Sequence, residues 1–165
     1  MGTYTCEDSF LFSHSLFGGL SAPEIESIKE GFNEEHYAIG DLILTQDEPN
    51  NKVFFILEGD VEIIKHSSEK DLADRLLSTL TAGDTFGEME LIDIQPCAAS
   101  ARATGKVRVL TFTNYDLYRL SKTHIKVYAM IIMNLAREIS RRLRKTDQEL
   151  AELLYEKQKQ ITSFD

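Results

Sequence analysis

The sequence has few of the residues that build disulfide frameworks, metal centres or membrane spans. Its two cysteines, Cys6 and Cys97, lie far apart, and neither they nor the four histidines show the spacing of metal ligands. No apolar run approaches the roughly 20 residues of a membrane span, and the N-terminus has no basic segment followed by an apolar one. We therefore expect no disulfide, no metal site, no membrane contact, and a cytoplasmic protein with reduced thiols.

Basic residues are scarce in the first part of the chain. Residues 1–93 hold 20 acids and 5 Lys or Arg, a net −15, whereas residues 94–165 hold 7 acids and 13 Lys or Arg, a net +6, giving −9 in total. An acidic protein repels the phosphate backbone, so we expect no nucleic-acid partner. The basic run at 137–145 favours a solvated helix face over a patch for nucleic acid or an acidic partner.

Short apolar runs separated by turns fill the middle of the 165-residue chain, which is long enough for one domain and an extended appendage. Between residues 37 and 112 these runs recur about every 8–12 positions. That rhythm, without alternating long helices, predicts an antiparallel β sandwich or small barrel. Before it, Ser21 and Glu24 form a capping-box pattern with Pro23 in the first turn, which predicts a short amphipathic helix.

The last third has a helical pattern. Asn114 is a good cap for a short helix to Leu120, and a long helix without glycine or proline follows over about residues 124–159. A helix of some 35 residues spans about 50 Å, more than this domain covers. We therefore expect a parallel homodimer joined by a short coiled coil, since a fold-back would need a turn that the sequence lacks. The seam of that coiled coil steps by 3 or 4 positions and comprises Ile132, Leu135, Ile139, Leu143, Thr146, Leu150 and Leu153.

We divide the chain into residues 1–121, a β domain with a helical lead-in, and residues 122–165, the long helix with a polar tail. The two parts form one structural unit.

The stretch from Gly83 to Ala103 has the composition of a small phosphate-binding site. Gly83 and Gly87 allow positive φ and close approach of the backbone to a ligand, and a short helical turn after Gly87 would expose its first N–H groups to an anion. Glu88 is then a single acid able to accept hydrogen bonds from a sugar. The alternative is an ordinary tight loop of a β protein.

Several segments together resemble the cyclic nucleotide-binding domain over about residues 14–155. They are F-G-G-L-S, G-D-L-I-L, F-F-I-L-E-G-D-V-E-I-I and T-A-G-D-T-F-G-E-M-E-L-I, followed by L-A-R-E-I-S-R-R-L. This domain is the sensor half of the catabolite activator protein and the regulatory module of cyclic-nucleotide-dependent kinases and channels. The resemblance implies an antiparallel jelly-roll β sandwich flanked by short helices, with a long C-terminal dimerisation helix.

The resemblance also assigns a ligand site. The family's phosphate-binding cassette places Glu88 on the ribose 2′-hydroxyl and Gly87 near the ribose and phosphate, while a threonine of the long helix reaches the purine. Pro96 and Ser100 match the cassette as well. The ligand-binding residues it implies are Phe86, Gly87, Glu88, Met89, Cys97, Ala98, Ala99 and Thr146.

Two residues depart from the family pattern. Cys97 stands where the family has the arginine that pairs with the cyclic phosphate, and Glu90 stands where it usually has alanine. Removing one partner of a buried charge pair costs about 2–5 kcal/mol, or roughly 30-fold to several-thousand-fold in affinity. Arg102 is the nearest cation in sequence, but its odd offset from Cys97 directs it to the opposite face of a regular strand. Cys97 is read as a buried inert thiol, with an exposed redox sensor as the alternative.

The resemblance implies a stand-alone sensor that binds cAMP or another effector in the β roll and signals through a homodimer. One alternative is a degenerate dimerisation or interaction scaffold, which Cys97 and Glu90 favour. Another is a fragment of a transcription regulator, whose winged helix-turn-helix would need more chain than follows Leu150 before Asp165. We expect no enzyme, because no Ser–His or Cys–His arrangement can be placed and Glu88 and Glu90 face different ways on a strand or helix.

Overall fold

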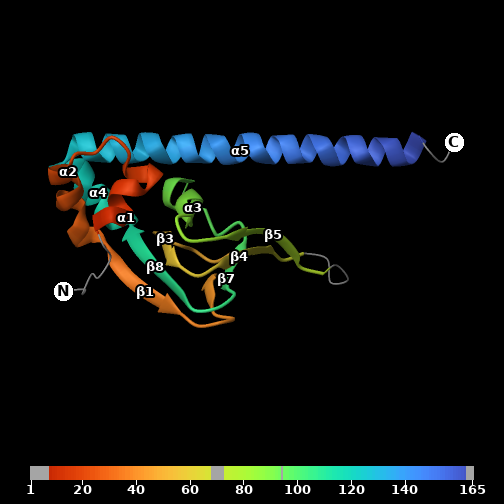
Figure 1. Ribbon diagram of the computed structural model, residues 1–165, viewed down its shortest axis with the longest axis horizontal. Coiled ribbons are helices and arrows are strands. Elements are labelled where there is room, and N and C mark those ends of the chain that lie inside the picture. Colours follow the sequence, from red (N-terminus) through yellow and green to blue (C-terminus); the bar gives the residue numbers. More distant parts are fainter. Residues whose placement is uncertain (1–7, 68–72, 94, 163–165) are drawn as a thin grey trace.

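The chain forms an antiparallel β roll packed beneath a layer of helices (Figure 1). The computed structural model describes residues 8–67, 73–93 and 95–162. Two four-stranded sheets have the strand orders β1-β8-β3-β6 and β2-β7-β4-β5, and all pairings are antiparallel, which confirms the expected sandwich. The strands are β1 (Asn33–Tyr37), β2 (Leu42–Leu44), β3 (Lys52–Glu58), β4 (Val61–Lys65), β5 (Arg75–Leu80), β6 (Thr85–Phe86), β7 (Ser100–Ala103) and β8 (Val107–Thr113).

The central strand β3 is buried on both faces, which explains its continuous apolar run. Phe54 and Ile56 point into the roll, where Phe54 stacks on Phe86 with ring centroids 4.9 Å apart. Val53 and Phe55 point the other way, into a second core shared with the helices. Because side chains alternate along a strand, one uninterrupted apolar run serves two cores.

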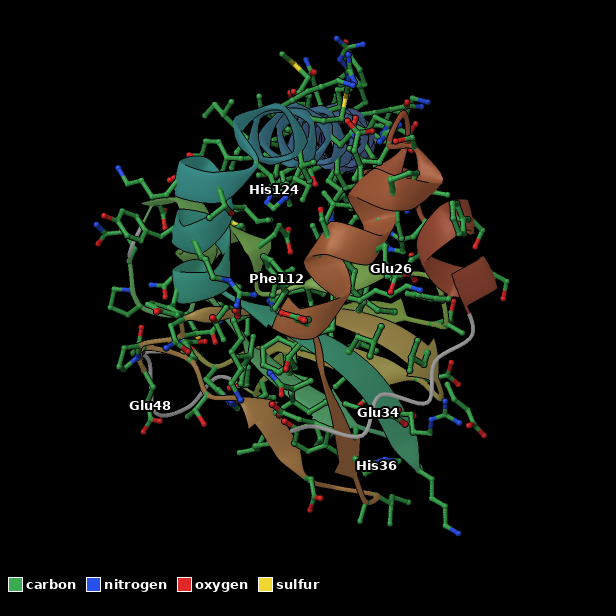
Figure 2. The ribbon with its side chains drawn as sticks, turned by 90° about the vertical axis from the view of Figure 1, so that its left-hand side faces the viewer. Glu26, Glu34, His36, Glu48, Phe112 and His124 are labelled. Carbon is green, nitrogen blue, oxygen red and sulfur yellow. The ribbon has the colours of Figure 1, made fainter. Side chains whose placement is uncertain are left out.

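Short helices cover the outer face of β3 and β8. Figure 2 turns the left-hand side of Figure 1 towards the viewer: Phe112 lies between the sheet and the helices, and His36 lies at the end of β1 away from the helices. Phe112 packs on Phe32 with ring centroids 5.0 Å apart. The elements are α1 (Asp8–Ser13), η1 (Ser15–Phe17), α2 (Ala22–Ile28), η2 (Lys29–Gly31), α3 (Glu88–Asp93), α4 (Asn114–Thr123) and α5 (Ile125–Thr162).

The capping box at the start of α2 is confirmed, whereas the predicted cap of α4 is wrong by one residue. The Glu24 carboxylate accepts from the Ser21 N–H at 2.8 Å. At α4 the cap is Thr113, whose hydroxyl accepts from the Asp116 N–H at 3.2 Å, and Asn114 is the first helical residue. Thr113 is the cap because it ends β8 in the extended conformation that an N-cap requires. The Asp116 carboxylate completes a capping box with Thr113. The helix also continues past Leu120 to Thr123.

The long helix α5 is one continuous segment of 38 residues, one residue later at its start and three later at its end than expected. Its first half packs on the domain: Val127, Ile131 and Leu135 are buried in the helical core. The side-chain amide of Asn134 donates to the Leu16 and Gly18 carbonyls at 2.9 Å each. Helix α5 is thereby fixed to the N-terminal segment.

The second half of α5 extends beyond the helical layer, over the side on which the β4–β5 hairpin projects (Figure 1). The predicted seam is therefore divided: Leu135 is buried in this chain's own core, whereas Leu143, Leu150 and Leu153 are 59%, 54% and 63% exposed. No helix among the described residues combines the length and the apolar character that a membrane crossing requires.

Candidate functional site

The Gly83–Ala103 stretch forms strand β6, the short helix α3 and the loop into β7. Gly83 and Gly87 have φ of +94° and +76°, as their predicted role requires. A Cβ atom at Gly87 would lie 2.8 Å from the Lys52 carbonyl oxygen and 3.0 Å from the Phe54 ring. The absence of a side chain at Gly87 therefore lets α3 begin directly against β3.

Glu88 is the buried acid of this stretch. It begins α3, is 4% exposed, and accepts a hydrogen bond from the Arg142 guanidinium of α5. Arg142 also donates to the Thr85 carbonyl at 3.4 Å. A carboxylate this buried needs a cationic or hydrogen-bonding partner, and α5 supplies one from 54 residues further along the chain.

Arg142 is the residue that sequence reasoning missed. It lies in the R-R-L segment that carried part of the resemblance, but only Thr146 was carried over from this helix. Thr146 is exposed, and its hydroxyl donates to the Arg142 carbonyl at 3.0 Å, one turn earlier on α5. The structure thus brings Glu88 and Arg142 together and leaves Thr146 on the helix surface beyond them.

Cys97 is buried, with 1% of its surface exposed. Its N–H donates to the Glu48 carbonyl at 2.8 Å, and its carbonyl accepts from the Asp47 N–H at 2.9 Å. Cys97 therefore ties the loop before β7 to the β2–β3 connection. The burial agrees with the inert-thiol reading and removes the solvent access that a redox sensor requires.

The remaining predicted residues differ widely in their exposure. Phe86 is 3% exposed and belongs to the interior of the roll, whereas Met89 is 51% exposed. Ala98 is exposed and Ala99 half-buried, both in the loop before β7, and the Glu90 side chain lies outside the described residues. Arg102 is on the outer face, as predicted, where it pairs with Glu62 at 2.7 Å.

A second polar cluster corrects the expectation that no Ser–His arrangement can be placed. His66 connects Asp74 to Ser100: its Nδ1 lies 2.9 Å from Asp74 Oδ2 and its Nε2 lies 2.9 Å from Ser100 Oγ. The Gln46 N–H also donates to Ser100 Oγ at 2.9 Å. Ser100 is 0% exposed, so its hydroxyl is closed to any substrate, and the cluster holds β7 to its neighbours.

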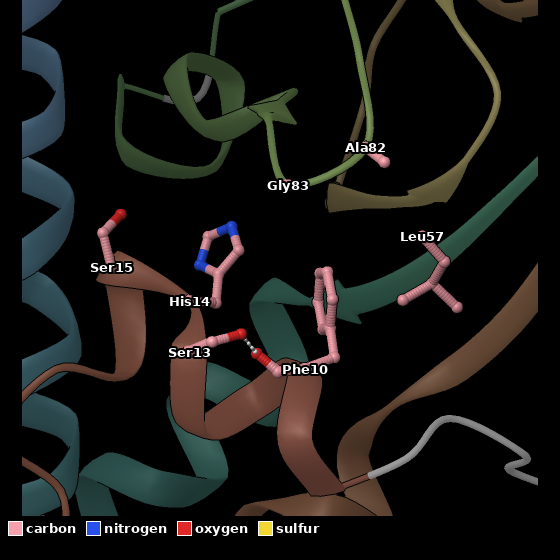
Figure 3. A pocket seen from close by; sticks show the side chains of 7 residues that line it. All are labelled: Phe10, Ser13, His14, Ser15, Leu57, Ala82 and Gly83. Atoms are coloured by element: carbon pink, nitrogen blue, oxygen red, sulfur yellow. Dashed lines mark hydrogen bonds between the residues drawn. The ribbon is translucent and has the colours of Figure 1, made fainter.

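A shallow cavity of about 480 Å³ lies between the N-terminal helices and the loop before β6 (Figure 3). The buried His14 lines it: Nδ1 accepts from the Leu16 N–H at 3.2 Å, so Nε2 carries the proton and donates to Thr85 Oγ1 at 3.1 Å. Burial lowers the pKa of His14, against the opposing effects of the Gly83 carbonyl, Glu138 and Asp84. The remaining lining residues are Phe10, Ser13, Ser15, Leu57, Ala82 and Gly83.

The β roll, the buried acid at the start of α3 and the long helix that contacts it have the architecture of a regulatory domain. The chain belongs to the cyclic nucleotide-binding domain family, whose model matches residues 34–124. That match covers more than half of the sequence, and the family is a regulatory one that is typically not catalytic.

Two of the relatives are regulators that differ in kind. The chain is 32% identical over 118 residues to the cAMP-dependent protein kinase regulatory subunit of Mycosarcoma maydis, covering 68% of this chain and 22% of that protein. It is 26% identical over 148 residues to the CRP-like cAMP-activated global transcriptional regulator of Mycobacterium tuberculosis H37Rv, covering 90% and 63%. The chain thus spans less than two thirds of either relative.

Solved structures agree with this assignment. The Thermus thermophilus catabolite activator protein superposes with a TM-score of 0.72 at 29% identity, covering 84% of this chain and 62% of that one. A cyclic nucleotide-binding domain from Methylobacillus flagellatus KT shares the fold, with a TM-score of 0.78 at 24% identity, covering 87% and 80%. The jelly-roll expectation is confirmed.

Proposed function

We propose that the chain is a cytoplasmic regulatory module that binds a cyclic nucleotide beside α3 and transmits this binding through α5 to a second copy. The observation that carries the proposal is the Glu88–Arg142 pair, which joins the predicted ligand acid directly to the long helix. Membership of the family and the cAMP-dependent relatives support the ligand class.

The pair gives a physical route from ligand to helix. A ribose hydroxyl that donates to Glu88 competes with the Arg142 guanidinium for the same carboxylate oxygens. Arg142 has five N–H donors, so it can keep one bond to Glu88 while another turns to the ligand. Arg142 can therefore be bonded to Glu88 alone or turned partly towards the ligand. Binding shifts α5 only if the ligand interacts differently with these two positions of Arg142, and the competition for the Glu88 carboxylate supplies such a difference.

The exposed distal half of α5 supports the homodimer in the proposal. Leu143, Leu150 and Leu153 lie on one side of the helix and are more than half exposed in the single chain. An apolar stripe repeating every three to four residues is the pattern that pairs helices in a coiled coil. A second copy presents the same stripe and covers it by two-fold symmetry.

The experiment is calorimetric titration of cAMP and cGMP into wild type, Glu88→Gln and Cys97→Arg. We expect saturable binding by wild type with a Kd on the order of 10⁻⁴ M, because the family's arginine is absent. Glu88→Gln should weaken binding about tenfold or more, since the amide is a poorer acceptor than a carboxylate. Cys97→Arg should strengthen it by roughly 30-fold or more.

Two checks keep the result interpretable. Gln148→Glu, on the exposed part of α5, is a matched change between amide and carboxylate that should leave ligand affinity unchanged. Near- and far-ultraviolet circular dichroism should show that each variant is folded. The proposal is wrong if neither nucleotide at millimolar concentration binds wild type or Cys97→Arg.

One alternative has its own observation. Cys97 is buried and offers no charge, and Glu88 is already paired with Arg142, so neither residue requires a ligand in a scaffold that binds no nucleotide. Such a degenerate module would still dimerise through α5, and neither cAMP nor cGMP would bind wild type or any variant in the titration.

A further inference from the structure

The proposed ligand site lacks a counter-charge for a phosphate. Arg142 is the cation nearest to Glu88, and the two charges cancel as an ion pair. Asp47 and Glu48 are the acids whose backbone groups bond Cys97, and their carboxylates make the local potential more negative. A cyclic phosphate bound here therefore needs a further cation, and the family's position for it holds Cys97.

Lys65, the last residue of β4, lies beside the loop that holds Cys97. Its ammonium donates a hydrogen bond to the carbonyl of Ala98, the residue directly after Cys97. Strand β4 pairs with β7, with Ile64 opposite Ser100, so the end of β4 lies beside the loop in which Cys97 and Ala98 stand. An ammonium has three donors, and the Ala98 carbonyl uses one of them.

A second cation stands on the same face. Lys65 is directly opposite Arg75 in the antiparallel β4–β5 pair, and both side chains are exposed. Like charges directly opposite each other on a sheet destabilise it. In the part of the chain that the structure describes, no carboxylate forms an ion pair with either one, although residues 1–93 hold 20 acids against 5 Lys or Arg. A bound anion would relieve this repulsion.

We propose that Lys65, supported by Arg75, supplies the positive charge for the phosphate of a cyclic nucleotide in place of the residue at position 97. The cation thus comes from the end of β4, the strand beside β7, and not from the loop that holds position 97. Its partner is the phosphate of the ligand. This inference rests on the proposed function, because it assigns the ligand's anionic group to a residue of the same site.

The test is the Kd of cAMP, measured by calorimetry at low salt, for wild type, Lys65→Met, Lys65→Arg and Lys106→Met. Lys106 is a matched control: it is exposed, in the turn between β7 and β8, and lies away from the Ala98 loop. Lys65→Met should raise the Kd about tenfold, as expected for losing one charge-assisted hydrogen bond. Lys65→Arg and Lys106→Met should leave it within about twofold.

The double variant identifies the role. If Lys65 replaces the arginine, Lys65→Met should cost much less in the Cys97→Arg background, because two residues that serve one partner are not additive. Equal affinity of wild type and Lys65→Met overturns this inference and leaves the proposed function standing. Binding by Cys97→Arg alone, with none by wild type, also overturns it, whereas no binding by either ends the proposed function itself.

Discussion

At the residue scale, the carboxylate of Glu88 and the guanidinium of Arg142 are the groups on which the site depends. Burying the Glu88 carboxylate without a partner would cost several kcal/mol, and the contact with the half-exposed Arg142 guanidinium offsets most of that cost. The pair is consequently a structural contact and, in the proposed function, also the point at which the ligand acts. Gly87 lies immediately before Glu88, and its backbone conformation places the start of α3, and so the Glu88 carboxylate, against β3.

The substitution Gly87→Ala tests how tightly the backbone at the start of α3 is constrained. The substitution adds a Cβ 2.8 Å from the Lys52 carbonyl oxygen at a φ of +76°. We expect a loss of about 2–4 kcal/mol in the free energy of unfolding, from backbone strain and steric overlap together. Urea unfolding followed by circular dichroism measures this loss.

Two other glycines separate the causes. Gly83→Ala has the positive φ but open space around it, so it should cost only about 1–2 kcal/mol. Gly105→Ala has neither constraint and should fall within about 0.5 kcal/mol of wild type. The interpretation is wrong if Gly87→Ala is no more destabilising than Gly83→Ala.

At the element scale, α5 has two halves with different surroundings. The first half is held by apolar burial and by the Asn134 amide, which makes two hydrogen bonds to the N-terminal segment. Arg142 marks the end of its contact with the roll, and the exposed stripe begins at Leu143. The Glu88–Arg142 contact thus lies at the junction of the two halves, which is where the proposed signal would pass to the exposed one.

Acidic substitutions on the stripe should dissociate the proposed dimer. Leu150→Glu or Leu153→Glu places a charge in an apolar seam, and each should raise the dimer dissociation constant by about 30-fold or more. Sedimentation equilibrium measures that constant. Tyr155→Glu is the matched control, because Tyr155 is equally exposed but lies about 140° around the helix from Leu150. A wild type that is monomeric at about 100 μM would refute the pairing.

At the scale of the whole molecule, His14 connects three parts of the fold. Its imidazole is packed against Phe55 of β3 with ring centroids 5.1 Å apart, caps η1 through Leu16, and donates to Thr85. Thr85 in turn accepts a bond from Arg142 through its carbonyl. The N-terminal layer, the roll and α5 therefore meet at one neutral histidine.

This arrangement predicts stability that falls in mildly acidic solution. Burial lowers the pKa of His14 below its ordinary 6.5. Below pH 6.5 the unfolded chain therefore binds a proton that the folded chain excludes, and the free energy of unfolding decreases as the pH falls from about 7 towards the folded pKa. Carboxylates with lowered pKa values, such as Glu24 at about 2, lose their stabilising contribution only as the pH falls through their ordinary value of 4.5 and below.

Chemical denaturation at pH 7.5, 6.5 and 5.5 measures the effect. His14→Asn keeps a side-chain acceptor for the cap and has no titratable ring, so its stability should change less over this range than that of wild type. His124→Asn, at an exposed position, controls for the removal of an imidazole. Parallel pH profiles for wild type and His14→Asn would contradict the assignment.

Local patterns in the sequence were enough to predict much of the fold. Apolar runs and turns predicted the antiparallel sandwich, the Ser21 capping box predicted the start of α2, and strand alternation placed Arg102 outward, because these features depend on neighbouring residues. The cap at Thr113 was missed because Asn114 is the better cap by residue type, and only the end of β8 decides between them.

The sequence by itself determined the β roll, the long helix, the position of Gly87 and Glu88, and the absence of arginine at position 97. Only the tertiary structure decided that Glu88 is paired with Arg142, that His66 links the buried Ser100 to the exposed Asp74, and that Lys65 reaches Ala98. The reason is physical: these side chains are far apart in the sequence and meet through sheet pairing and helix packing, which no local periodicity encodes.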